Sequence, residues 1–201
     1  MFRRQAVLDA GLYRPQMVPA EDYDLWLRLS ERHDLANLPD VLLRYRLHSA
    51  QSTANREEAV AVATLVAQAA HRERLAGRPD PVDAAVSLSP DLLGLLGIRE
   101  AAISRQTLLT ALSRSETLLA VTSSESQAFG VLNMLKNDRV TKKQPHLWNA
   151  CRHWLRARVA CKHGRFFKAF TNFSAAIVAD RSFAKRLTWA VVRWATQSRL
   201  R

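Results

Sequence analysis

The stretch from Arg56 to the C-terminus limits the fold more than any other feature, because nearly all of it has the pattern of α-helices. The whole chain has only 6 glycines and 7 prolines, so long apolar segments run without a helix-breaking residue. Helices are predicted over residues 56–76, 99–114, 126–136, 146–163, 165–179 and 182–199. The segments predict an α-helical bundle of about six helices.

The first 55 residues have a different pattern. Residues 2–10 predict a short helix that ends at Gly11. Residues 21–33 predict a second helix, whose acidic first turn and basic last turn suit the helix dipole. Residues 41–48 have the composition and partial alternation of a β-strand. The predicted fold class is therefore mainly α, with a small α/β portion before the α-helical bundle.

Positive charge is concentrated towards the C-terminus. The net charge is +12, and residues 139–201 hold fifteen Lys and Arg residues against a single acid, Asp180. A near-neutral first part and a strongly basic second part indicate two functional halves. The basic half predicts a polyanionic neighbour, either anionic lipid or nucleic acid. No recognised nucleic-acid-binding motif is present, so nucleic acid is not the expected partner.

The two cysteines, Cys151 and Cys161, are too few for a disulfide framework. Residues 1–20 do not resemble a signal peptide. Both observations favour a cytoplasmic location, and peripheral contact with the inner membrane face stays open. A histidine follows each cysteine two positions later, and side chains with this spacing point to different faces of a helix. The pattern therefore favours buried thiols over a zinc site.

Three acids near the start of the helix predicted over residues 21–33 are candidates for chemistry. Glu21 and Asp22 open this helix, where acids commonly stabilise the N-terminus. Asp24 and Arg28 have the spacing of an ordinary ion pair on a helix surface. Taken alone, these residues predict only a well-formed helix.

The predicted strand carries the other candidates. Alternation places Arg44, Arg46 and His48 on one face and Leu43, Tyr45 and Leu47 on the other. Without further information, the polar face is typical of a strand that faces solvent.

Several of these features follow one another in a fixed order between residues 2 and 53. The segments are FRRQAVLDAGLYR, then PAEDYDLWLRL, then LANLPDVLLRYRLH. This order resembles the closing section of the catalytic domain in family 2 glycosyltransferases, which have the GT-A fold. The resemblance implies an inverting transfer of a sugar from a nucleotide-sugar donor to a hydroxyl of a saccharide or lipid-linked acceptor. It says little about the sugar.

The resemblance also implies roles for residues of the helix at 21–33. Asp22 would be the general base that takes the proton of the acceptor hydroxyl, and a helix N-terminus would keep it ionised. Glu21 would orient the acceptor or support Asp22. Trp26 would line the acceptor side, although a tryptophan beside Leu25 and Leu29 also fits a core position.

On the returning strand, the resemblance implies contacts to the donor. Arg44 and Arg46 would neutralise the diphosphate leaving group. His48 would be a ligand of a divalent metal, Mg or Mn, in the complete family enzyme. Whether this chain alone binds a metal stays open.

The donor-binding part of the family is missing from the sequence. Its βαβ units and its metal-binding Asp-x-Asp would precede Met1, and Asp22-Tyr23-Asp24 lies at a helix start with no apolar strand before it. The tripeptide is therefore interpreted as the base motif. The expectation is a truncated glycosyltransferase that is incomplete as an enzyme by itself.

The C-terminal half contains two further patterns. Residues 163–181 resemble the second half of a tetratricopeptide repeat, with Gly164 at the turn, and they predict a helical hairpin. Residues 182–199 predict a helix with apolar and basic faces, which suits either an anionic membrane surface or a packed terminal helix. An alternative function is thus a non-catalytic adaptor that binds an anionic membrane or a protein partner.

The predicted organisation has three parts. Residues 1–53 form the end of the GT-A catalytic domain, and residues 54–78 form a connecting helix. Residues 79–201 form the basic helical extension. The expected context is the synthesis of a cell-surface polysaccharide.

Overall fold

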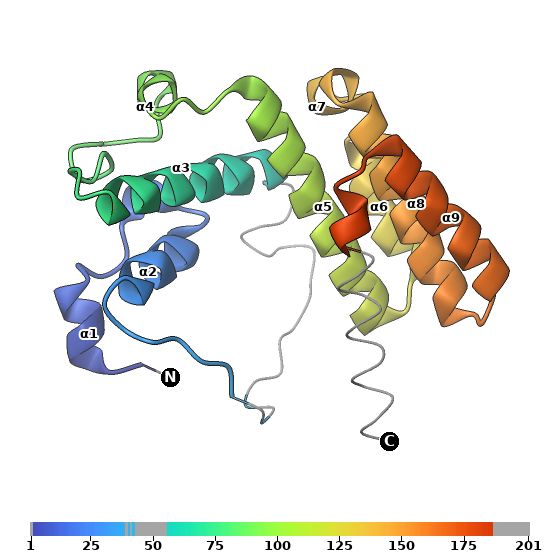
Figure 1. The fold of residues 1–201 in the computed structure, drawn as a ribbon, viewed down its shortest axis with the longest axis horizontal. Helices are drawn as coiled ribbons and strands as arrows, with labels where there is room; N and C mark the ends of the chain where they lie inside the picture. The colour runs from blue at the N-terminus through green and yellow to red at the C-terminus, as the bar shows by residue number, and fades with distance from the viewer. Residues whose placement is uncertain (1, 39, 41, 43–55, 187–201) are drawn as a thin grey trace. The chain divides into compact units, whose positions relative to one another are not determined.

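The computed structural model describes residues 2–38, 40, 42 and 56–186, and this part of the chain is mainly helical (Figure 1). Contacts within the chain divide it into two compact units, Met1–Thr107 and Leu108–Arg201. In chain order the helical elements are α1 (Arg4–Asp9), the 3-10 turn η1 (Pro15–Met17), α2 (Glu21–Ser30), α3 (Glu57–Leu75), α4 (Pro90–Leu95), α5 (Glu100–Thr122), α6 (Glu125–Met134), α7 (Arg139–Lys143), α8 (Pro145–Lys162) and α9 (Phe166–Ala179).

In the N-terminal unit, α2 packs against the long helix α3. Small side chains on α3 allow this close approach, and Ala63, Ala67 and Ala70 are fully buried. Two apolar clusters stabilise the unit. One is formed by Met17, Val66, Ala67, Ala70, Val82 and Leu92, and the other by Val7, Leu25 and Leu29.

Helix α1 ends where the sequence predicts. Gly11 follows it with a φ of +83°, a conformation that glycine adopts without steric cost. Its N–H donates to the carbonyl of Leu8 at 3.0 Å. The predicted helix at 2–10 and its glycine stop are thus confirmed.

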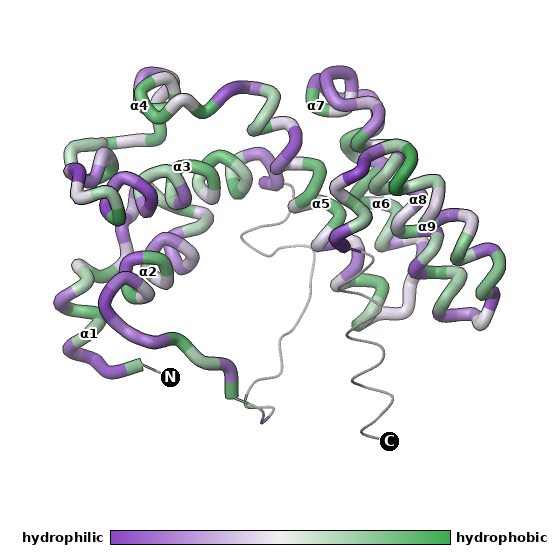
Figure 2. The backbone as a smooth tube through the Cα atoms, viewed as in Figure 1, coloured by the Kyte–Doolittle hydropathy of each residue, from purple (hydrophilic) through white to green (hydrophobic). Residues whose placement is uncertain are grey.

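In the C-terminal unit, α8 and α9 pack side by side as a hairpin. Hydrophobic residues recur along both helices (Figure 2). Trp154 of α8 is buried and meets Phe173 and Phe183 edge-on, with ring centroids 5.0 and 5.5 Å apart. Gly164 makes the turn with a φ of +66°. The predicted helical hairpin is confirmed, and its likeness to a tetratricopeptide repeat stays a prediction.

Three helices differ from the prediction. α5 continues to Thr122, and Ser115, Thr117 and Thr122 within it donate their hydroxyls to carbonyls four residues earlier, as hydroxyl side chains inside a helix commonly do. The short helices α4 and α7 were not predicted. Ser89 and Asp138 cap them through bonds to nearby backbone N–H groups.

The mainly α class is confirmed, and no strand occurs within residues 2–38, 40, 42 and 56–186. The α/β portion is not shown, because the predicted strand at 41–48 falls outside the described residues, apart from the non-strand residue Leu42. The helix predicted over 182–199 is described only as far as residue 186, where 183–186 are helical. The three-part domain organisation stays a prediction. Among the helices that are described, none combines the length and apolar character needed to cross a bilayer.

Candidate functional site

Helix α2 has one face towards solvent and one towards the core, and the candidate site residues are divided between them. Asp22 and Trp26 are four residues apart, share one face and are exposed. Asp24 and Arg28 lie on another face and are buried, next to the buried Leu25. Packing of the buried faces fixes which side chains α2 presents to solvent.

The two predicted catalytic acids have different environments. Asp22 is exposed, and its Oδ1 accepts the backbone N–H of Tyr23 at 2.7 Å. Within the described part of the chain, no ion pair holds Asp22. Glu21 is half-buried, and its Oε2 is buried with no hydrogen-bond partner among the described residues. A carboxylate on the helix N-terminus is thus open to an incoming molecule, beside a second that points inward.

Trp26 belongs to the surface more than to the core. It is 36% exposed, and the ring of Phe2 lies against it with centroids 6.0 Å apart and planes tilted by 57°. The core alternative for Trp26 therefore does not hold. Two aromatic rings one helical turn from Asp22 provide an apolar platform beside a carboxylate.

Asp24 corrects the prediction of a surface ion pair. It is 0% exposed, and its Oδ2 accepts the Nε of Arg14 at 3.0 Å and the Nη2 of Arg28 at 2.9 Å. Arg14 Nη2 also donates to Asp24 Oδ1. A buried carboxylate held by two guanidinium groups has a structural role. Within the Asp-x-Asp tripeptide, Asp22 is thus accessible to an incoming molecule, whereas Asp24 is fixed in the core.

Arg28 also secures the preceding turn. Its guanidinium donates to the carbonyl of Leu12 at 2.6 Å and to the carbonyl of Ala10. These carbonyls lie just after α1, where helix geometry leaves acceptors unpaired. One arginine therefore joins α1, the Gly11 turn and α2.

An extended charge network continues from Arg14 towards α3. Asp80 accepts from Arg14 at 2.9 Å and from Arg74 of α3 at 2.5 Å. Arg74 also donates to Glu31, just after α2, and His71 lies 2.6 Å from the same carboxylate. The network links α2, α3 and the loop after α3.

The network changes the acidity of its members. Burial raises the pKa of Asp80, but a hydrogen bond from the Val82 N–H, the charge of Arg14 and side-chain hydrogen bonds from Arg74 and Arg14 outweigh it and hold this pKa below its usual value. Burial likewise raises the pKa of Glu31, and bonds from Arg74 and His71 reverse the effect. Both carboxylates therefore stay charged under ordinary conditions. Nothing in the local sequence predicts this network, because Arg14 and Asp80 are 66 residues apart.

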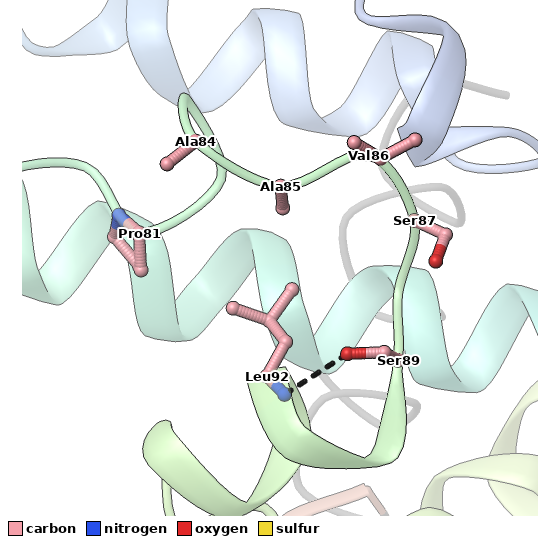
Figure 3. Close-up of a pocket in the computed structure, with 7 residues that line it drawn as sticks. All are labelled: Pro81, Ala84, Ala85, Val86, Ser87, Ser89 and Leu92. Carbon is pink, nitrogen blue, oxygen red and sulfur yellow. Dashed lines mark hydrogen bonds between the residues drawn. The ribbon is translucent and has the colours of Figure 1, made fainter.

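Two of the hollows are lined by described residues of the N-terminal unit. One, of about 490 Å³, is lined mainly by apolar residues of η1, α3 and the loop before α4, with Glu58 as its charged residue. The other, of about 320 Å³, is lined by Pro81, Ala84, Ala85, Val86, Ser87, Ser89 and Leu92 (Figure 3). The dashed line in Figure 3 is the hydrogen bond that the backbone N–H of Leu92 donates to Ser89 Oγ, at 3.2 Å. Neither lining includes Glu21, Asp22 or Trp26.

The predicted donor-side residues Arg44, Arg46 and His48 lie outside the described residues. Across the described residues, no three His, Cys, Asp or Glu side chains gather in a way that could hold a metal ion. Both thiols were predicted to be buried; Cys151 is buried, but Cys161 is exposed, so the prediction is wrong for Cys161.

Comparison with known proteins gives one match. Fifty residues, 24% of the chain, are 48% identical to AmsE of Erwinia amylovora, an amylovoran biosynthesis glycosyltransferase. The matched segment is 18% of the length of AmsE. No protein-family model matches the chain, and no solved structure matches it. Part of the chain is therefore similar in sequence to a glycosyltransferase.

Proposed function

We propose that residues 2–53 are the acceptor-side end of an inverting family 2 glycosyltransferase domain of the GT-A type. The observation that supports this most directly is the 48% identity to AmsE over fifty residues. The surface of α2 agrees with it, because Asp22 is exposed at a helix N-terminus while Asp24 is fixed in the core.

In this proposal the acceptor sugar lies across α2. Its apolar face packs on Trp26 and Phe2, and its hydroxyl approaches Asp22. Asp22 takes the proton as the oxygen bonds to the anomeric carbon of the donor, and the nucleoside diphosphate leaves from the opposite side. The N-terminal end of α2 stabilises the ionised form of Asp22 until the proton moves. Glu21 orients the acceptor.

The donor side of the proposal rests on the sequence resemblance alone. Arg44 and Arg46 bind the diphosphate, and His48 is a ligand of Mg or Mn in the complete enzyme. No step described for α2 depends on that metal. The acceptor is a saccharide or a lipid-linked saccharide, and the proposed location is the cytoplasmic face of the inner membrane.

A chimera tests the proposal. Residues 2–53 of this chain replace the equivalent segment of AmsE, and transfer from nucleoside diphosphate sugars is measured. We expect the chimera to be active and Asp22→Asn to lower kcat by about 10²- to 10⁴-fold, because a general base is lost. Binding of the nucleotide sugar, measured by calorimetry, should not change.

Asp34→Asn is the matched control, since it removes another exposed carboxylate close to α2. It should leave kcat within about twofold of the parent chimera. Equal rates for Asp22→Asn and Asp34→Asn in an active chimera would rule out the base assignment. A folded chimera with no transfer at all would count against the proposed family.

A further inference from the structure

The first turns of α9 expose three phenylalanines. Phe166, Phe167 and Phe170 are 72, 83 and 69% exposed. Positions 166, 167 and 170 share one side of a helix. Another side of α9 carries Ala169 and Ala176, which are buried. The three exposed rings therefore contribute little to the packing within the α8–α9 hairpin.

Exposed aromatic side chains in a cluster usually mark a surface that binds something apolar. Leaving one phenylalanine in water is ordinary, but three on the first two turns of one helix are not. Because α9 is packed along α8, the hairpin fixes the backbone positions from which the three rings project. We call residues Lys162–Phe170, which include the turn at Gly164, the hairpin tip.

The charges around the hairpin tip are mainly positive. Arg165 and Lys168 are exposed among the phenylalanines, and Lys162 donates to the carbonyl of Leu119 at 3.2 Å. One carboxylate lies at this end, Glu125, and it is 2.7 Å from His163. The tip thus combines apolar rings with cations.

The end of α5 adds to this surface. The bonds from Lys162 to Leu119 and between His163 and Glu125 place the α5–α6 connection next to the hairpin tip. Val121, in that region, is another exposed apolar side chain. Apolar side chains from two parts of the C-terminal unit are therefore exposed at the same end.

We propose that the hairpin tip is a membrane-docking site that inserts Phe166, Phe167 and Phe170 into the interface of an anionic phospholipid bilayer. Phenylalanine gains free energy at the boundary between headgroups and acyl chains, and nearby Lys and Arg side chains bind lipid phosphates. The single acid in residues 139–201 leaves this region little negative charge to oppose such a surface. The site is independent of the proposed sugar transfer, and it is distinct from the terminal helix predicted over 182–199.

Vesicle binding of the full chain tests this site. We expect co-sedimentation with vesicles of 70% phosphatidylcholine and 30% phosphatidylserine, and much weaker binding to phosphatidylcholine alone. Raising the salt concentration should weaken binding. Replacing all three phenylalanines by serine should lower the partition coefficient by about 1,000-fold, since each of the three buried rings contributes about tenfold. Arg165→Glu with Lys168→Glu should lower binding to the anionic vesicles only.

Cys161 provides a direct readout at the site. It is exposed whereas Cys151 is buried, so an environment-sensitive thiol dye should attach at Cys161, one turn before the hairpin turn. Its emission should shift to the blue when anionic vesicles are added. The triple serine variant should show no such shift.

The control variant carries Val86→Ser and Leu95→Ser, which remove exposed apolar side chains from the N-terminal unit. It should bind like the parent, and circular dichroism should show unchanged helix content in every variant. Three outcomes would overturn the proposal. These are no binding to anionic vesicles, undiminished binding by the folded triple serine variant, and a parent that self-associates through the three phenylalanines without binding vesicles.

Discussion

Asp22 and Asp24 are two residues apart, and the fold gives them opposite environments. Asp22 faces water, whereas Asp24 is surrounded by Arg14 and Arg28. Breaking a buried ion pair leaves the remaining charge without compensation. The two residues should therefore respond differently to the same substitution.

We predict that Asp24→Ala lowers the free energy of unfolding of the N-terminal unit by about 3–5 kcal/mol. Asp22→Ala should lower it by less than about 1 kcal/mol, because only an exposed interaction with the helix dipole is lost. Urea unfolding followed by circular dichroism measures both. Similar losses for the two variants would contradict the structural role of Asp24.

The thiol of Cys161 should react slowly at neutral pH. Partial desolvation raises its pKa, and the positive charge of Arg158 offsets only part of this effect. A higher pKa means less thiolate at a given pH, so the alkylation rate should reach half of its maximum at a pH above that of an unstructured cysteine, which is about 8.5. The rate of iodoacetamide labelling between pH 7 and 10 checks this, with a short cysteine peptide as control.

For single residues, the sequence predicts which side chains share a helix face better than it predicts whether they are buried. The 3.6-residue period places Asp22 and Trp26 together, and the structure has both at the surface. The same period places Asp24 with Arg28 but cannot tell whether the pair is buried. Burial depends on Arg14 and on the Asp80 loop, which only the folded chain brings to α2.

Among the elements, the α8–α9 hairpin depends on its turn. Gly164 has a φ of +66°, and no atom would obstruct a side chain there, so the cost of Gly164→Ala is conformational. We predict a loss of about 1 kcal/mol in stability. Gly130→Ala is the matched control, because Gly130 lies inside α6 with equally open surroundings, and it should gain about 0.5–1 kcal/mol. Thermal unfolding should separate the two variants in sign.

The contact between α2 and α3 should weaken in acid. Asp80 and Glu31 have pKa values below their usual ones, so the folded form holds their protons less tightly than the unfolded chain does. Their stabilisation is complete above the unfolded pKa values, about 3.9 and 4.3, and is lost as pH falls through the lower folded values.

The melting temperature measured from pH 7 down to pH 2 should therefore fall below about pH 4. Asp80→Asn should lower stability at pH 7 and reduce this acid dependence. An unchanged acid dependence in the variant would show that other carboxylates account for it.

The elements also show where local patterns fail. The glycine stop of α1 and the hairpin were predictable, because both depend on adjacent residues. The end of α5 was predicted eight residues too early. Serine and threonine often mark helix ends, and the sequence does not show that they lie inside this helix with their hydroxyls bonded to its backbone. α4 and α7 are 6 and 5 residues long, too short for a hydrophobic period to appear.

For the whole molecule, the two units have separate apolar cores. Val66 belongs to a cluster of the N-terminal unit, and Leu112 to that of the C-terminal unit. We predict two unfolding transitions in urea, with Val66→Ala lowering the midpoint of one and Leu112→Ala that of the other. Residue-resolved hydrogen exchange can assign each transition to its unit. One transition shifted equally by both substitutions would show a single cooperative fold.

The hydrogen bonds from the Arg28 guanidinium to backbone carbonyls have a consequence for any transfer of this segment between proteins. Arg28 joins the turn after α1 to α2 through hydrogen bonds. The ring of Phe2, just before α1, packs against Trp26. A graft that took α2 without α1 would leave Arg28 short of its carbonyl acceptors and Trp26 without its aromatic neighbour. The shortest segment that can be transferred therefore begins at Phe2 and includes both α1 and α2. The tripeptide Asp22-Tyr23-Asp24 alone is not sufficient.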